Sequence, residues 1–449
     1  KKSLLWLVVV LLSVSMIAAF SLAGCKKAEE AAATAEEEVA KEEAPAEEEA
    51  EEAPAEEPVT ITVASWRTED VEGMKVLHDL FTKEYPNIKV EFAPIKNTEY
   101  YAQIGTALET GTGVADVYSL HSFGTGKKIY EGGYLANLND LIPELTEMAA
   151  TSTDPWATEG VIYGVPWCAV SHGIYYNKEI FDKYGIEEPK LWSEFIEICD
   201  TLKENGETVF AQGSKDSWTL QAMGYSNYGA NFYGGEESRQ KLMAGELKFT
   251  DEPFVRAFEA VDSLTKYYPE GYQALDYVST QQMFVTGQAA MFLGGSWEIA
   301  PFKNMGMEFE CGWFAPPVEN EGDRLQYSWC NGSGLGMYVD TPYRDEVITY
   351  LKWLLSPVAC QAMMNEIPGF YTYVPGDYEF ESPLAEAMFK ATENADLTER
   401  VTYDKVSDQE PSGSDLLYEA LTSLANGEYT PEEAAKHVQD GLETWYEFK

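Results

Sequence analysis

The sequence has 449 residues and a formal net charge of −45, because 76 acidic residues face only 31 Lys and Arg. A chain this acidic lacks the basic surface that displaces counterions from nucleic acid, and it repels polyanions at long range, so we expect no nucleic-acid partner. Residues 59–449 still carry about −36 once the four lysines of the first 27 residues and the net −13 of residues 28–58 are set aside, and their length suggests two domains.

The chain begins with two lysines and the apolar run LLWLVVVLLSVSMIAAF over residues 4–20, and Leu-Ala-Gly stands directly before Cys25. A basic start, an apolar middle and small residues before a cleavage point are typical of a secretory signal. The run is shorter than the ~20 residues of a spanning helix, although a transmembrane anchor is the alternative. The pattern is similar to a bacterial lipoprotein signal, which implies removal of residues 1–24 and several lipid chains on Cys25 that hold the protein to the membrane.

The segment after Cys25 consists almost entirely of Glu, Ala and Pro, with fourteen Glu and one Lys in residues 28–58. It offers too little apolar surface to offset the entropy lost on ordering, and its like charges keep it extended. We therefore predict that residues 25–58 form a lipidated cysteine followed by a disordered acidic tether. An acidic interaction tail is the alternative.

Alternation of β-branched residues in VTITVASW, residues 59–66, predicts a strand. A helical pattern, VEGMKVLHDLFTKEY, comes next, followed by the strand pattern IKVEFAPI, a helical span around residues 100–110, and the turn and apolar strand of GTGVADVYSL. This β-α-β-α-β order is typical of a parallel sheet with helices on its faces, so the predicted fold class is α/β.

Ligands of such sheets gather at the carboxyl ends of the strands. This rule selects Trp66 and Arg67 after the first strand, and Ser119 and His121 at the end of the third. Trp218 is a further candidate, because it follows the strand-like VFAQG and opens a helix. For each of these residues the alternative is an ordinary solvent-exposed loop position.

Four later stretches carry a more specific signal: GVIYGVPW (160–167), HGIYYNKEIFDKYGIEEPKLWSEF (172–195), GQAAMFLGGSW (287–297) and YLKWLLSPVACQAMMNEIPGFYTYVPG (350–376). In order and spacing they resemble the family 1 extracellular solute-binding proteins of ABC importers, the family that includes maltose-binding protein. The resemblance covers nearly all of residues 59–449. It implies a two-lobed periplasmic-binding-protein-like fold, with a hinge and a ligand cleft between the lobes that closes on the ligand.

The resemblance also implies an organisation and a function. Residues 59–168 plus 331–395 would form lobe 1, and residues 169–330 plus 396–449 would form lobe 2. The protein would be a monomeric extracytoplasmic receptor, without a cofactor or metal, that binds a neutral mono- or oligosaccharide. It would deliver this sugar to the permease subunits of an ABC importer.

By the same resemblance, the Trp of Gly-Gly-Ser-Trp stacks on a sugar ring, which selects Trp297; a core tryptophan is the alternative. Glu298 follows it and is a candidate acceptor for sugar hydroxyls, or simply an acid in a first helical turn. Trp167 ends the first of the four stretches, near the expected hinge. Trp329 and Asn331, in YSWCNGSGLGMYV, precede an apolar strand that should re-enter lobe 1.

Other functions fit parts of the composition. An acidic cleft suits a cation, so a polyamine-binding protein is one alternative. A secreted carbohydrate hydrolase would need two carboxylates flanking the scissile bond, and 76 acidic residues always offer some pair. A surface lipoprotein without a ligand is the third. Aromatic residues make up 13% of the chain, with eleven tryptophans, which suits sugar faces and ordinary cores equally.

Five cysteines follow Cys25, and none of them form a C-x-x-C pair. This spacing argues against a zinc site. A bridge between Cys311 and Cys330 and buried free thiols both remain open. Of the four histidines, His78 and His437 lie on predicted helices as expected solvated residues, and His121 is the contact candidate.

Overall fold

The computed structural model describes residues 58–449. The predicted signal peptide (1–24), the lipidated Cys25 and all but the last residue of the tether (25–58) lie outside the described residues. Within residues 58–449, no helix has the length and apolar character needed to cross a bilayer.

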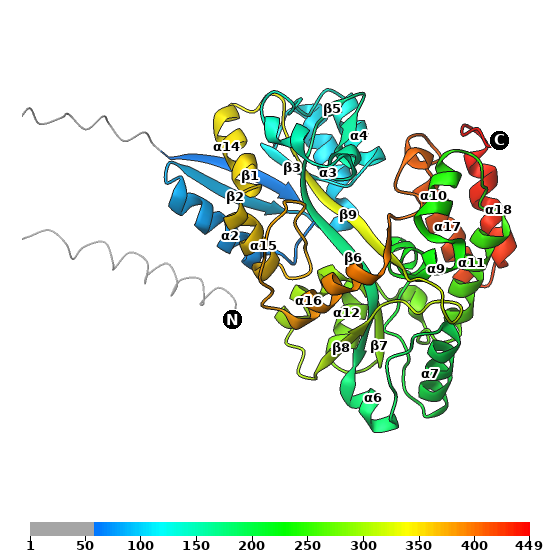
Figure 1. Ribbon diagram of the computed structural model, residues 1–449. Helices are drawn as coiled ribbons and strands as arrows, with labels where there is room; N and C mark the ends of the chain where they lie inside the picture. Colours follow the sequence, from blue (N-terminus) through cyan, green and yellow to red (C-terminus); the bar gives the residue numbers. More distant parts are fainter. Residues whose placement is uncertain (1–57) are drawn as a thin grey trace, which may run out of the picture. The chain divides into compact units, whose positions relative to one another are not determined.

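The predicted β-α-β-α-β unit is confirmed (Figure 1). The central strand pairs in parallel with both of its neighbours, in a register that sets Val59 opposite Ile88 and Val63 opposite Val117. The elements of this unit are β1 (Val59–Ser65), α2 (Val71–Glu84), β2 (Ile88–Pro94), α3 (Asn97–Thr110) and β3 (Val117–Leu120).

Two long antiparallel strands, β6 (Val165–Asn177) and β9 (Gln326–Met337), extend this sheet, whose order is β2-β1-β3-β9-β6-β7. One end of β9 pairs with β3, whereas the far end of β6 pairs with β7 (Met291–Gly295) and β8 (Cys311–Phe314). Figure 1 shows these two strands running from one half of the sheet to the other. The pairing of β6 with β9 shifts register around Cys168, as expected of a β-bulge.

The hydrophobic core is divided along the same two strands. Two clusters cover the faces of the β1–β3 sheet, one around Leu77 and Phe81 and the other around Tyr100 and Tyr118. The third and largest cluster gathers the helices around β7. We call these two halves lobe 1 and lobe 2.

The remaining elements complete the two lobes. They are β4 (Ala157–Thr158), β5 (Val161–Ile162), β10 (Asp396–Thr398), α4 (Gly124–Glu131), α5 (Ala150–Thr153), α6 (Lys178–Tyr184), α7 (Trp192–Glu204), α8 (Ser226–Tyr228), α9 (Ala230–Tyr233), α10 (Gly235–Met243), α11 (Glu252–Thr265), α12 (Tyr277–Val285), α13 (Ile299–Asn304), α14 (Arg344–Leu354), α15 (Pro357–Glu366), α16 (Pro383–Ala391), α17 (Gly413–Ala425) and α18 (Pro431–Leu442).

Helix α16 packs into the hydrophobic core of lobe 2, whereas we expected it in lobe 1. The predicted lobe 1 extended to residue 395, but Ala385 and Met388 of α16 belong to the lobe 2 cluster. The Tyr175 hydroxyl lies 3.9 Å from the Met388 sulfur, and the Tyr371 hydroxyl donates to the Ala385 carbonyl at 3.0 Å. Besides β6 and β9, the chain therefore passes between the lobes a third time, near Tyr371. The exact lobe boundaries remain a proposal.

His78 is not solvated, contrary to our expectation. Helix α2 packs against α14 and α15, and this contact buries the histidine, whose Nε2 lies 3.0 Å from the Tyr350 hydroxyl. Burial lowers the pKa of His78 to about 4, so the ring is neutral at pH 7.

The open question about Cys311 and Cys330 is also answered, because both are free thiols. Cys311 pairs with Asn177 of β6, whereas Cys330 pairs with Val170. These two positions on β6 are about 23 Å apart at ~3.3 Å per strand residue, which is far beyond the reach of a disulfide.

Candidate functional site

A cavity of about 530 Å³ is lined by residues of both lobes. It lies at the carboxyl ends of β1 and β3, where the sheet rule places ligands. Lobe 2 contributes residues 216–222, the first turn of α12, the turn after β7, and the segment that follows β10. The lining residues used below are Trp66, Arg67, Tyr101, His121, Trp218, Tyr277, Trp297, Arg400 and Tyr403.

The lobe 1 wall is aromatic. The ring centroid of Trp66 lies 3.9 Å from that of His121 and 6.4 Å from that of Tyr101. The Tyr101 hydroxyl accepts a hydrogen bond from the His121 backbone N–H at 2.8 Å, which fixes the two residues relative to each other. Burial, together with the nearby charge of Arg400, lowers the pKa of His121 to about 3, so the imidazole of this aromatic cluster is neutral at pH 7.

The lobe 2 wall is built around Trp297, which lies in the turn directly after β7. Its ring packs edge-on to His172, with a centroid distance of 5.0 Å, and is only 7% exposed. Trp218 and Tyr277, with ring centroids 4.8 Å apart, form a second aromatic pair on the cavity. The cavity therefore carries flat apolar faces from both lobes.

The turn that carries Trp297 is fastened to the crossing segments. The Ser296 hydroxyl accepts from the Ser171 N–H of β6 at 3.0 Å and donates to the Gly369 carbonyl at 2.5 Å. Gly369 has a φ of 97°, and a Cβ there would lie 1.9 Å from the Ser296 carbonyl oxygen. Only glycine fits this approach, which fixes the base of Trp297.

Arg400 lies between two aromatic rings of this wall. Its guanidinium carbon is 5.5 Å from the Trp297 ring centroid and 4.9 Å from that of Tyr403. Its Nη1 donates to the Tyr403 hydroxyl at 3.1 Å, and its Nη2 lies 3.4 Å from His172 Nε2. Burial lowers the pKa of His172 well below its usual value, so the neutral ring accepts from Arg400 and donates from Nδ1 to the Ser328 hydroxyl at 2.9 Å.

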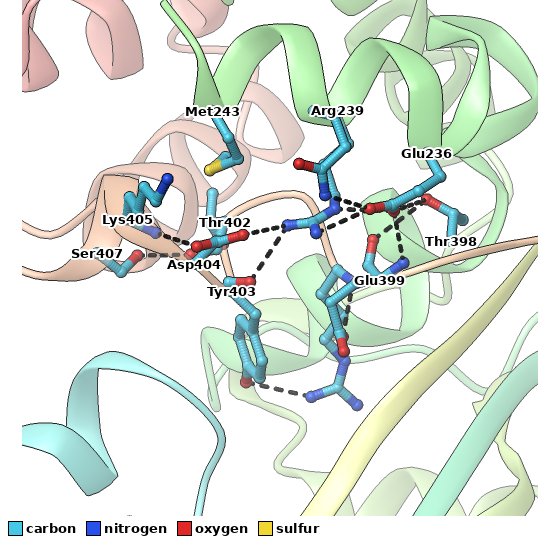
Figure 2. Close-up of polar contacts among 12 residues, drawn as sticks. Glu236, Arg239, Met243, Thr398, Glu399, Thr402, Tyr403, Asp404, Lys405 and Ser407 are labelled. Atoms are coloured by element: carbon cyan, nitrogen blue, oxygen red, sulfur yellow. Dashed lines mark hydrogen bonds and ion pairs between the residues drawn. The ribbon is translucent and has the colours of Figure 1, made fainter. Parts of the chain in front are cut away.

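A second arginine, Arg239 of α10, holds the segment that presents Arg400 (Figure 2). Arg239 Nε and Nη2 donate to the two carboxylate oxygens of Glu236 at 2.8 and 2.9 Å, and Nη1 donates to Asp404 and to the Tyr403 carbonyl, each at 3.3 Å. Glu236 in turn accepts from the Glu399 N–H at 3.1 Å. The backbone on both sides of Arg400 is therefore anchored to one helix.

Arg67 joins the two walls. It pairs with both carboxylate oxygens of Asp70 at 2.8 Å, its Nη2 donates to the Trp297 carbonyl at 3.4 Å, and its guanidinium lies 5.3 Å from the Phe370 ring centroid. Its charge is therefore balanced within lobe 1, while one hydrogen bond reaches the turn of lobe 2.

Residues 64–359, well over half of the chain, match the sequence model of the family described as bacterial extracellular solute-binding protein. The chain belongs to this family. It is therefore a solute-binding protein rather than an enzyme, and it acts outside the cytoplasm.

Individual relatives of this solute-binding protein are distant. An uncharacterized ABC transporter extracellular-binding protein of Pyrococcus horikoshii is 26% identical over 251 residues, which is 54% of this chain and 57% of that protein. The multiple sugar-binding protein of Streptococcus mutans is 25% identical, covering 68% of this chain and 72% of its own length. The maltodextrin-binding protein of Bacillus subtilis is 23% identical, with 70% and 75% covered.

Solved structures agree on the fold. A chitin oligosaccharide binding protein superposes with a TM-score of 0.72 at 22% identity, covering 86% of this chain and 98% of that one. Maltose-bound MalE3 of T. maritima gives 0.68 at 21% identity, with 86% and 99% covered. At these identities the likeness shows the two-lobed fold and leaves the ligand open.

Of the ten site residues selected from the sequence of this solute-binding protein, five line the cavity: Trp66, Arg67, His121, Trp218 and Trp297. Their contact with a ligand stays a prediction. Ser119 and Trp167 do not line it. Ser119 is buried within β3, where its carbonyl accepts from the Tyr100 hydroxyl, and Trp167, at the bulge of β6, packs edge-on to Phe370.

The last three candidates are held away from the cavity by partners of their own. Trp329 stacks on Tyr371 with ring centroids 4.8 Å apart. Asn331 donates to the Glu399 carboxylate from its backbone N–H at 2.9 Å and from its amide at 2.5 Å, and it accepts from the Tyr373 hydroxyl at 2.6 Å.

Glu298, the third, is fully buried under α12. Its two carboxylate oxygens accept from the Tyr277 hydroxyl and from Gln281 Nε2, each at 2.7 Å. Burial raises the pKa of Glu298 from 4.5 to about 7. It therefore acts as a buried acid that supports the Tyr277 wall and makes no contact with the cavity.

Glu298→Gln should make the protein more stable at pH 8 than the wild type. The unfolded chain releases this proton near its ordinary pKa of 4.5, whereas the folded protein holds it until about pH 7. The protonated carboxyl thus contributes fully to the free energy of unfolding below pH 4.5, and this contribution is lost as the pH rises through 7. Urea unfolding at pH 5 and pH 8 should show a wild-type decline of about 2.5 kcal/mol from this group that the variant lacks.

The exposed Glu308→Gln is the matched control, and it should follow the wild type at both pH values. An equal decline in wild type and Glu298→Gln would contradict the assignment of a raised pKa to Glu298.

Sequence reasoning missed the residues that complete the cavity, above all Tyr101, Tyr277, Arg400 and Tyr403. Tyr101 could have been found, because it lies near the start of the helix that follows the second strand. Arg400 and Tyr403 lie in TERVTYDK, where no pattern of spacing marks a binding segment.

Proposed function

We propose that this solute-binding protein captures a sugar, a mono- or oligosaccharide, between its two lobes and delivers it to the permease subunits of an ABC importer. The observation that carries the proposal is the cavity itself, on which lobe 1 presents Trp66 and Tyr101, lobe 2 presents Trp218 and Tyr277, and Trp297 lies where the two lobes meet. A ligand held between these walls would favour the closed state, because it touches both lobes only there.

The chemistry of the walls suits a sugar. Indole and phenol rings offer flat apolar faces that match the CH faces of a pyranose, and their polar edges stay available for hydrogen bonds. Polar side chains at the cavity, including Asn97, Asp216, Gln221 and Ser333, supply donors and acceptors for hydroxyl groups. Such pairing is needed, since a buried hydroxyl without a partner costs about 1–3 kcal/mol.

The names of several relatives support the same class of ligand, whereas two others, of Agrobacterium fabrum and Rhizobium meliloti, are named sn-glycerol-3-phosphate-binding proteins. Besides the multiple sugar-binding and maltodextrin-binding proteins, those that support it include a diacetylchitobiose binding protein of Streptomyces coelicolor, 25% identical over 364 residues, and a mannitol-binding protein of Pseudomonas aeruginosa, 21% identical over 371 residues. All of these ligands are rich in hydroxyl groups.

A polyamine fits this cavity poorly. Its ammonium groups would lie beside the Arg400 guanidinium, and like charges in a partly buried site repel each other. Asp404, one of the lining carboxylates, is also already paired, since it accepts from Arg239 at 3.3 Å. The cation alternative therefore gains no support from the cavity.

The lipid anchor on Cys25, the acidic tether of residues 25–58 and the monomeric state are further parts of this proposal. The Leu-Ala-Gly-Cys pattern supports the anchor, and the composition of residues 28–58 supports the tether. Such an anchor would keep the receptor close to its importer while it captures solute.

The test is a thermal-shift screen of residues 59–449 against neutral and acidic mono- and oligosaccharides, sugar alcohols, polyamines and amino acids. A ligand at 100 times its dissociation constant should stabilise the protein by about 2.7 kcal/mol. A shift with a saccharide supports the proposal. A shift confined to polyamines or amino acids would overturn the sugar while leaving the solute-binding family intact.

A further inference from the structure

Arg400 differs from the other partly buried arginines of the described residues in the partners it has. Arg67 pairs with Asp70, Arg239 with Glu236, and Arg256 with Glu319. No Asp or Glu within residues 58–449 forms an ion pair with Arg400; the adjacent carboxylate, Glu399, accepts from Asn331 and from the Arg400 backbone N–H. Arg400 is therefore a cation at the cavity wall that forms no ion pair, and the charge of Glu399 attracts it only from beyond ion-pair distance.

The hydrogen bonds of this guanidinium are also incomplete. Of its five N–H groups, one on Nη1 donates to the Tyr403 hydroxyl and one on Nη2 to His172, and both partners are neutral. Nε is buried without any partner. A buried cation that lacks both an ion pair and full hydrogen bonding is costly to keep. A ligand that brings a negative charge to the remaining Nη hydrogens would offset part of this cost.

We propose that the captured sugar carries a carboxylate, as a uronic acid residue does, and that Arg400 receives this group while the sugar ring stacks beside Trp297. The inference rests on the proposed function and narrows its substrate from a neutral sugar to an acidic one. A planar guanidinium suits a carboxylate, because its parallel N–H groups match the two oxygens. The flanking rings of Trp297 and Tyr403 hold the guanidinium in one plane.

The charge balance of the cavity favours one carboxylate over a phosphate. Arg67 is already paired with Asp70, and Lys128 pairs with Glu410 at 2.5 Å. Lys96 also lines the cavity, but it is exposed to solvent. Because the carboxylates Glu69, Asp216 and Asp415 also line the cavity, one guanidinium without an ion pair matches at most a single negative charge, whereas a phosphate monoester carries about −1.5 to −2 at pH 7. The acidic protein surface repels a polyanion more than a monoanion, and salt screens that repulsion beyond about 8 Å.

The experiment compares matched sugars by isothermal titration calorimetry on residues 59–449. The pairs are glucose with glucuronate, galactose with galacturonate, and a galacturonate disaccharide with its neutral counterpart; glucose 6-phosphate is added as the phosphate arm. We expect at least one uronate to bind about 10- to 100-fold more tightly than its neutral partner, the range of a charge-assisted hydrogen bond. This preference should disappear in Arg400→Gln.

Two further variants separate recognition from folding. Arg324→Gln removes an exposed arginine that pairs with Asp396 at 2.6 Å, and it should keep the full preference. Arg400→Lys keeps the charge but not the planar fork, and it should retain only part of the preference. Without ligand, Arg400→Gln should melt at the same temperature as the wild type or higher, since it removes an unpaired charge; a merely structural arginine would lower it.

The outcomes are distinguishable. Equal or tighter binding of the neutral partners would overturn this inference and leave the sugar receptor standing. Preference for glucose 6-phosphate would replace the carboxylate with a phosphate. A uronate preference that survives Arg400→Gln would overturn the role of this residue. Binding of polyamines or amino acids alone would overturn the proposed function itself.

Discussion

Replacing Trp297 with alanine should abolish measurable ligand binding, with an affinity loss of at least about 100-fold. The ring provides the flat wall of lobe 2 and one of the two faces that flank the Arg400 guanidinium. Its removal would take away the stacking surface and free Arg400 at the same time. Calorimetric titration with the saccharide that gives the largest thermal shift measures this loss.

The substitution also costs stability, because Trp297 packs into the lobe 1 core and the truncation of a buried tryptophan costs about 3–5 kcal/mol. Trp297→Phe separates the two effects, since it keeps a ring on the cavity and should recover part of the affinity. Trp329→Ala is the matched control: that ring stacks on Tyr371 outside the cavity, so affinity should stay within about threefold. Wild-type affinity in Trp297→Ala would remove this residue from the site.

Replacing Arg239 with methionine should be among the most destabilising single changes in lobe 2. The side chain is only 4% exposed, and it neutralises Glu236 and Asp404 together. Methionine fills a similar volume but leaves both carboxylates without their cation, and the loss of one partner from a buried ion pair costs about 3–5 kcal/mol. Urea unfolding at pH 7 measures this cost.

The same variant should weaken ligand binding although Arg239 does not line the cavity, because it holds the Tyr403 carbonyl and, through Glu236, the Glu399 N–H (Figure 2). Arg324→Met is the control. It breaks an exposed pair with Asp396 of β10, so it should cost no more than about 1 kcal/mol and leave the affinity unchanged. Destabilisation without any change in affinity would show that the 399–404 segment keeps its geometry without this anchor.

The parts of the fold that were predicted correctly are those with a local signal. The alternation of VTITVASW and the helical periods that follow it gave the β-α-β-α-β order, since each element is specified by its own residues. Trp66 and His121 line the cavity because strand ends are positioned by the sheet itself. Trp297 was found through the Gly-Gly-Ser-Trp motif that the resemblance supplied.

The candidates that lie outside the cavity, and the lining residues that were missed, depend on pairing between distant segments. Trp167 lies at the β-bulge of β6, where the register with β9 shifts, and a shift of one residue exchanges the two faces of a strand. Trp329 and Asn331 turn away from the cavity because Tyr371 and Glu399, far along the chain, pack against them. Arg400 reaches the cavity only through the pairing of β10 with β9 and its anchorage to α10.

The attachment of Ser296 to Ser171 and to Gly369 has a mechanical consequence for ligand capture. Two lobes that rotate about their connecting strands displace each residue in proportion to its distance from the rotation axis. Trp297 is hydrogen-bonded through Ser296 to those strands and should move least, whereas Trp66 and Tyr101 should move farther. We therefore expect Trp297 and Arg400 to keep the same relative position in the open receptor. The ligand would then bind to these two residues before the lobes rotate.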